Sequence, residues 1–195
     1  MNKIKLMSLK LVFILSIGFS SSAQSLNEEK LPYYEVPEYS EKFTAGTMAA
    51  RMVDALGFRF YWASDSLTEK DLAYKANEAG RTSLETIQHI YNLSKIIVNS
   101  TLKQPNSNKK EELSYIELRV KTLHNLKIAA DILRESEDVS EYKIIFGDRE
   151  IPFWNQINGP IADSIWHCGQ LVIYRRNTGN PINPKVNHFT GKVSL

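Results

Sequence analysis

Four residues near the end of the chain have the types and the spacing that metal chemistry requires. Asp163, His167, Gln170 and Tyr174 occupy positions i, i+4, i+7 and i+11 of one stretch, so in a helix they share one face. A carboxylate and an imidazole one turn apart can bind the same divalent ion if another segment supplies a further ligand. His89 is our candidate for that further ligand.

Two polar residues lie about one turn from these candidate ligands and could orient them. Glu85 precedes His89 by four positions, and Gln170 follows His167 by three. A hydrogen bond from either residue to the neighbouring ring would fix which ring nitrogen faces the metal. Glu85 has an equally good alternative role, because Thr82-x-x-Glu85 matches the capping box of a helix start.

The other histidines and the single cysteine are less suited to this site. His124 shares a helix face with acidic residues, which is typical of a polar outer face, and His188 falls in a tail that we expect to be loop. Cys168 directly follows His167, so its side chain points about 100° away in a helix. We expect it to pack as a small hydrophobe. With one cysteine no intramolecular disulfide can form, so the fold must rest on its core.

The first residues have the features of a secretory signal peptide. Residues 1–23 carry three lysines, then an apolar run from Leu11 to Phe19, then small residues up to Ala23. We predict cleavage after Ala23 and a secreted or periplasmic mature chain. An uncleaved anchor is the alternative, although the run is short for a membrane span. The mature chain would then have an N-terminal arm, residues 24–43, and one domain, residues 44–195.

The charge balance argues against a nucleic-acid partner. The whole chain has 24 basic and 22 acidic residues; removing residues 1–23, with their three lysines and no acid, leaves 21 basic against 22 acidic residues. The basic character therefore belongs mostly to the predicted signal. No clustered basic stripe of the kind that binds nucleic acids is present, and we expect no membrane partner after signal cleavage.

The remaining pattern predicts four long helices and no convincing alternating strands. Apolar residues recur at helical spacing over residues 44–67, 82–100, 111–134 and 152–176. The last helix contains Gly159-Pro160, where we expect a kink or a break. The predicted fold class is an all-α antiparallel four-helix bundle.

The inward faces of these helices follow from the same spacing. Met48, Leu84 and Ile116 are among the residues that the periodicity assigns to the core of the bundle.

With these residues assembled, the chain resembles the DinB-like superfamily, whose four-helix-bundle metalloproteins include damage-inducible and thiol-transferase-related proteins. The resemblance rests on the segment 83–94 around His89 and on His167-Cys168-Gly169-Gln170. The downstream segments 174–181 and 187–192 also fit. It covers residues 44–192, but only the two histidine segments are diagnostic.

The resemblance implies a divalent metal, most often nickel or zinc, held by one histidine of the second helix and two histidines of the last. His89 and His167 match that pattern. The position four before His167 is Asp163 in this chain, and aspartate can ligate the same metals. We therefore predict a metal site of His89, Asp163 and His167, with zinc or nickel favoured and manganese or iron as further candidates.

Two classes of function follow from such a site. The first is a metal-dependent enzyme, a hydrolase or a transferase, acting on a small molecule that the sequence does not identify. Hydrolysis suits an exported protein better than thiol transfer, because such a protein meets little reduced thiol, and Asp163 or Glu85 could then serve as base. The second is a non-catalytic bundle, which could be a homodimer, that binds a metal or another ligand. A degenerate site in a purely structural bundle is a third reading.

Overall fold

The computed structural model describes residues 30–107 and 109–194. The predicted signal peptide and the first part of the arm lie outside the described residues. The helices are α1 (Ala45–Ala63), α2 (Glu69–Ala73), α3 (Ser83–Thr101), α4 (Tyr115–Arg134), the 3₁₀ turn η1 (Val139–Glu141), α5 (Trp154–Gln156), the π-helical segment η2 (Ile157–Ile161) and α6 (Ala162–Thr178). The strands are β1 (Ile144–Phe146), β2 (Arg149–Ile151), β3 (Val186–Asn187) and β4 (Lys192–Val193).

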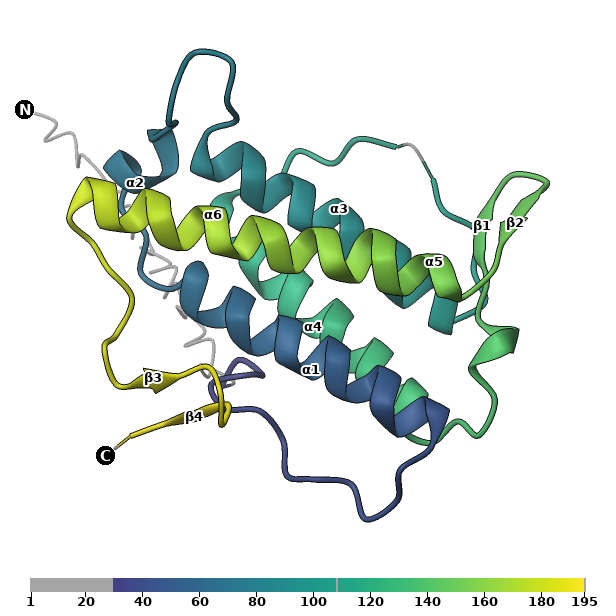
Figure 1. Ribbon diagram of the computed structural model, residues 1–195. Coiled ribbons are helices and arrows are strands. Elements are labelled where there is room, and N and C mark those ends of the chain that lie inside the picture. Colours follow the sequence, from purple (N-terminus) through teal and green to yellow (C-terminus); the bar gives the residue numbers. More distant parts are fainter. Residues whose placement is uncertain (1–29, 108, 195) are drawn as a thin grey trace, which may run out of the picture.

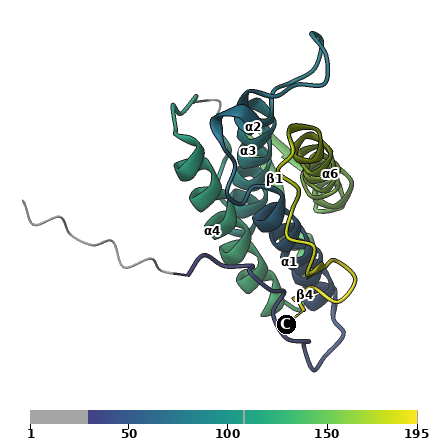
Figure 2. The ribbon, with the colours of Figure 1, turned by 90° about the vertical axis from the view of Figure 1, so that its left-hand side faces the viewer.

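The four long helices form the predicted all-α bundle. Helix α4 packs against α1 and α3 on one side, and α6 packs against the same two helices on the other. Seen from the end, α4 and α6 therefore lie on opposite sides of the α1 and α3 pair (Figure 2). Among the described helices, none is long and apolar enough to cross a membrane.

Consecutive long helices are antiparallel except at one connection, where α3 and α4 run in the same direction (Figure 1). As a result α1 and α6 also run in the same direction, with Arg175 near the end of α6 bonded to the Trp62 carbonyl oxygen near the end of α1.

The middles of α3 and α4 are in contact, because the Asn125 amide of α4 donates to Ser94 of α3. Tyr115 at the start of α4 bonds to Ser64 directly after the end of α1, so α4 is antiparallel to α1. The segment 102–114 makes this crossover. Thirteen extended residues reach about 43 Å, whereas α3 is about 28 Å long, so the chain can return along the whole bundle.

Side-chain caps decide where the helices begin. Thr82 and Glu85 form the predicted capping box of α3, and Ser114 and Glu117 form another at the start of α4. The second box places the start of α4 at Tyr115, four residues later than predicted. Glu111 lies before this helix and pairs with Lys95 of α3 instead, at 2.7 Å.

The end of α1 also differs from the prediction. The helix stops at Ala63, not at Leu67, because the Ser64 hydroxyl bonds to the Phe60 carbonyl oxygen and Ser66 adopts a left-handed backbone, with φ of 51°. The short segment that follows forms α2, whose cap is Thr68.

The last helix is broken where the sequence predicts a break. Gly159 has φ of −93° and ψ of −109°, which is not helical, and Pro160 follows it inside η2. Proline has no N–H for the helical ladder, so α5 and α6 are joined through a wide irregular turn. Helix α6 then continues to Thr178 and ends at Gly179, with φ of 88°.

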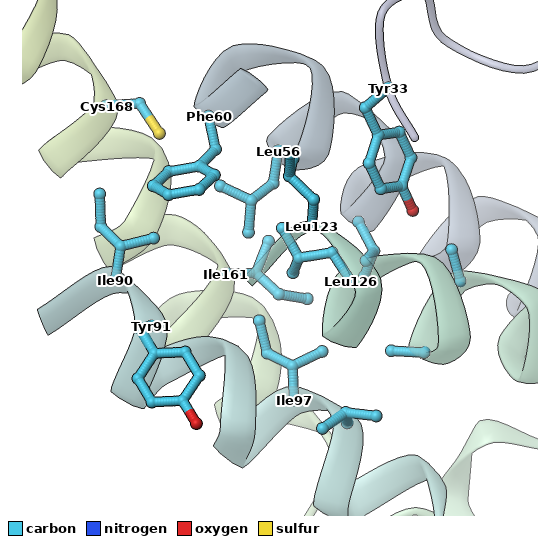
Figure 3. Packing of buried hydrophobic residues seen from close by; sticks show 14 of the residues in the cluster. Tyr33, Leu56, Phe60, Ile90, Tyr91, Ile97, Leu123, Leu126, Ile161 and Cys168 are labelled. Carbon is cyan, nitrogen blue, oxygen red and sulfur yellow. The ribbon is translucent and has the colours of Figure 1, made fainter. Parts of the chain in front are cut away.

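One hydrophobic core fills the space between the helices (Figure 3). Leu56 and Phe60 of α1 and Leu123 and Leu126 of α4 are fully buried in it, together with Ile161 from the break. Three residues assigned to the core by periodicity lie outside it: Met48 is 53% exposed, Leu84 39% and Ile116 60%. Each lies within two residues of a buried side chain, so it is on a face of its helix that is turned away from the core; the buried neighbours are Ala49, Ser83 and Leu118.

The arm and the tail cover one side of the bundle together. Tyr33 is buried in the core, and its ring occupies the space beside Gly57 of α1. The backbone of Val36 donates to the carbonyl oxygen of Gly191 at 2.8 Å, next to the β3–β4 pair. This pair and the β1–β2 hairpin are small antiparallel sheets that the sequence did not predict, because strands of two or three residues are too short to show an alternating pattern.

Candidate metal centre

The three predicted ligands come from two neighbouring helices. His89 lies in the second turn of α3, whose start the capping box of Thr82 and Glu85 fixes. Asp163 and His167 lie one turn apart on α6, directly after the break. Helices α3 and α6 pack side by side (Figure 1), so the pair on α6 faces the single histidine on α3.

The ligand atoms converge on one point. The Nε2 atom of His89 lies 3.1 Å from Oδ2 of Asp163, and the Nε2 atom of His167 lies 3.4 Å from Oδ1 of the same carboxylate. The two imidazole rings are nearly perpendicular, with centroids 4.7 Å apart. One ligand atom from each residue lies within 4.8 Å of the others. In residues 30–107 and 109–194 this is the one group of three or more histidine, cysteine or acidic side chains so arranged.

The group is half-buried and reachable from solvent. The side chain of His167 is 12% exposed, that of His89 28% and that of Asp163 41%. The imidazole rings are therefore held by protein on most sides, whereas the carboxylate lies at the rim of the cluster. A small molecule could reach the point where the three side chains meet.

Gln170 contacts His167 as the spacing suggests. Its Oε1 atom lies 2.6 Å from Nδ1 of the imidazole. An amide oxygen only accepts hydrogen bonds, so with this amide orientation Nδ1 carries the proton. In the neutral ring Nε2 then holds a lone pair, and it faces an acceptor oxygen of Asp163. Two acceptors facing each other call for a cation between them, which is either a proton or a metal ion.

The environment of His89 favours its neutral form. Burial lowers the pKa of His89 below its usual value, and the positive charge of Arg81 acts in the same direction, while the hydrogen bond to Asp163 opposes both. A neutral imidazole is the form that ligates a metal. Arg81 was not singled out in the sequence, where a basic residue just before a capping box carries no signal of its own.

Glu85 has its capping role in this structure. Its Oε2 atom accepts from the backbone N–H of Thr82 at 2.8 Å, and this bond lowers the pKa of the Glu85 carboxyl. The carboxylate is thus engaged at the start of α3, which is the alternative account given by the sequence pattern.

The other histidines and the cysteine, which the sequence pattern argues against as ligands, lie outside the cluster. His124 is on α4 and its Nδ1 atom bonds to the Val120 carbonyl oxygen. His188 is in the tail, with its ring against Phe58. Cys168 is buried in the core, and burial raises the pKa of its thiol to about 12, so it is no nucleophile.

Comparisons with known proteins identify the fold. No protein-family model matches the chain, and no curated protein matches it. Among solved structures, a DinB-like protein of Bacillus subtilis, YjoA, is similar, with a TM-score of 0.55 and 18% sequence identity. The match covers 70% of this chain and 96% of that one. The resemblance predicted from the two histidine segments is therefore confirmed for the architecture, and the chain has the DinB-like fold.

Proposed function

We propose that the protein binds one divalent metal ion through His89, Asp163 and His167. The observation that supports this most directly is the convergence of three ligand atoms within 4.8 Å of one another. Ligands bound tetrahedrally at about 2.0–2.1 Å are separated by about 3.3 Å from each other. His89 lies 3.1 Å from one oxygen of the Asp163 carboxylate and His167 lies 3.4 Å from the other, so each imidazole has a carboxylate oxygen at about that spacing.

The donor set narrows the choice of metal. Two imidazole nitrogens and one carboxylate oxygen suit zinc and nickel, and the same set also holds mononuclear iron and manganese. A site with only oxygen ligands would have indicated magnesium or calcium instead. We favour zinc or nickel.

We further propose that the site is catalytic. Three protein ligands leave at least one coordination position open, and a bound metal supplies an acidified water or a polarised substrate oxygen there. In this arrangement the chain holds Nε2 of His167 toward the ion through the bond from Nδ1 to Gln170. The exposed side of Asp163 leaves room for a small substrate. Hydrolysis of a small molecule in the cell envelope or outside the cell fits the predicted signal peptide.

Metal content tests this proposal. The chain from Gln24 to Leu195 would be prepared without a histidine tag, reconstituted with zinc, nickel, manganese and iron, and analysed by plasma mass spectrometry. We expect about one equivalent in the parent and its loss in His167→Ala. The matched control is His124→Ala, which removes a histidine of α4 outside the cluster and should leave the metal content unchanged.

The alternative hypothesis, that the three side chains bind no metal, predicts no metal in the parent chain. The 3.1 Å separation between His89 and Asp163 also suits a direct hydrogen bond from Nε2 to the carboxylate. If the parent binds none of the four metals after reconstitution, the cluster is a polar contact between α3 and α6, and the enzyme proposal fails.

A further inference from the structure

A cavity of about 580 Å³ opens beside the candidate metal centre. Its walls come from three parts of the chain: α3, the β1–β2 hairpin, and the broken helix with the start of α6. The lining includes Leu93, Ile96, Ile144, Phe146, Asp163 and Trp166.

The cavity and the metal cluster share a residue. The Asp163 carboxylate contacts both histidines and also lines the cavity. On the facing helix, Leu93 follows His89 by four residues, so it lies one turn along the same face of α3. A molecule that fills the cavity would therefore extend to within reach of the metal ligands.

The break in the last helix gives the cavity part of its space. Gly159 and Pro160 line it, and a side chain added at Gly159 would meet no atom within 4 Å. An uninterrupted helix would bring side chains and a regular backbone to this position. The irregular turn instead leaves open space directly before Asp163.

The chemistry of the walls selects the kind of molecule that fits. Aliphatic and aromatic side chains make up most of the lining, Asn158 is the one neutral polar side chain, and Asp163 is the one charged group. Trp166 is 72% exposed and Phe146 37%, so both rings present apolar surface without a protein partner covering it. Among the described residues, the lining holds no lysine or arginine that could pair with an anionic group, whereas an uncharged ring would gain contacts on several sides.

We infer that this cavity, which has room for an aromatic ring or a larger group, receives an uncharged apolar group of the substrate, while the reactive polar group of the same molecule lies at the metal. The inference rests on the proposed metal centre for the position of the reactive group. It assigns Trp166 and Phe146 as residues that contact the substrate and set its specificity.

Two zinc-binding probes that differ only in a ring test the inference. Benzohydroxamate and acetohydroxamate carry the same chelating group, and binding of each to the zinc-loaded chain can be measured by calorimetry. Burial of a ring-sized apolar group predicts that benzohydroxamate binds at least about tenfold more tightly. Equal affinities would overturn the inference and leave the metal centre standing, whereas no binding of either probe would count against the metal centre.

A matched pair of tryptophan variants locates the effect. Trp166→Ala should reduce the preference for benzohydroxamate to less than about threefold. Trp154→Ala removes a tryptophan that is 77% exposed on α5 and outside the cavity lining, so it should keep the full preference. Equal preferences in the two variants would contradict the assignment. Circular dichroism would show that both variants fold.

A neutral dye tests the cavity without any metal. N-phenyl-1-naphthylamine fluoresces on entering an apolar site, and its titration into the chelator-treated chain gives a dissociation constant. We expect Trp166→Ala to weaken binding at least about fivefold relative to Trp154→Ala. The same constant in both variants would overturn the inference even if zinc never binds.

Discussion

The two ends of α6 hold polar clusters that differ in how completely their hydrogen bonds are satisfied. At the C-terminal end, the Asp71 carboxylate is 2% exposed, yet both of its oxygens have donors. The hydroxyl of Thr178 donates to Oδ1, and the amide of Asn180 and the backbone N–H of Thr68 each donate to Oδ2 at 2.8 Å. This cluster joins α2 to the end of α6 and needs no further ligand.

At the N-terminal end, the Asp163 carboxylate is partly exposed and faces two imidazole rings. One of these rings presents a lone pair to it, since Nδ1 of His167 carries the proton and donates it in a hydrogen bond to Gln170 Oε1. A saturated cluster stabilises the fold by itself, whereas a cluster in which acceptors face each other gains most from a cation supplied from outside. The completeness of hydrogen bonding therefore separates a structural charged group from a candidate binding site.

The largest expected effect is on the stability of the fold, and it comes from the Asp71 cluster at the C-terminal end of α6. Asp71→Asn leaves buried donors without a charged acceptor, and we expect it to lower the free energy of unfolding by about 3 kcal/mol. Urea denaturation followed by circular dichroism measures this, and zinc content should stay at the parent level. A loss of less than about 1 kcal/mol would show that the network at this end is not structural.

The same substitution at Asp163, at the N-terminal end of α6, should give the opposite pair of results. Without metal, Asp163→Asn should change stability by no more than about 0.5 kcal/mol, as for other partly exposed positions. With zinc at one hundred times its dissociation constant, the parent gains about 2.7 kcal/mol, and the variant should lose most of this gain. Thermal unfolding with and without zinc separates the two terms. Equal gains in parent and variant would remove Asp163 from the ligand set.

A smaller effect is expected from the residue that orients a ligand. Gln170→Leu keeps the size of the side chain but removes the acceptor for Nδ1 of His167. We expect zinc affinity to fall about tenfold to a hundredfold, with stoichiometry kept at one. Competition with a chromogenic chelator measures the affinity. Loss of all zinc would indicate that Gln170 is itself a ligand, and an unchanged affinity would show that the ring needs no orienting bond.

The sequence predicted the all-α bundle, and it grouped the three side chains that the structure brings close together. His89, Asp163 and His167 could be grouped because helical spacing places two of them on one face and the family resemblance points to the third. The capping box at Thr82 and the break at Gly159 are also local patterns, and both occur as predicted. Such local patterns predict structure well because they depend only on residues within one or two turns.

What the sequence missed depends on packing between distant segments. The common direction of α3 and α4 requires a long crossover, and the cap at Ser114 lengthens it by delaying the start of α4. The exposure of Met48 and Ile116 depends on which face of each helix the neighbouring helices cover. The cavity beside Asp163 is likewise formed by three segments, so the periodicity of any one helix does not predict it.

The smallest effect is a pH dependence at the saturated end. Burial alone would raise the pKa of Asp71, but hydrogen bonds from Thr178, Asn180 and Thr68 outweigh it and hold the pKa well below its usual value. A carboxylate whose pKa is lower in the folded chain stabilises the fold fully above its unfolded pKa of about 3.9, and this contribution is lost as pH falls toward the folded value. The difference in stability between the parent and Asp71→Asn should therefore be constant between pH 6 and 8, at about its full value. It should shrink below about pH 4, by up to about 1.4 kcal/mol per pH unit.

Urea denaturation at each pH measures this difference. A chelator is added because removing metal keeps the Asp163 cluster at the other end of α6 from contributing. A difference that stays constant down to pH 3 would show that the loss in Asp71→Asn comes from side-chain packing and not from the charge, and the contrast between the two ends of α6 would then no longer rest on hydrogen bonding to a carboxylate.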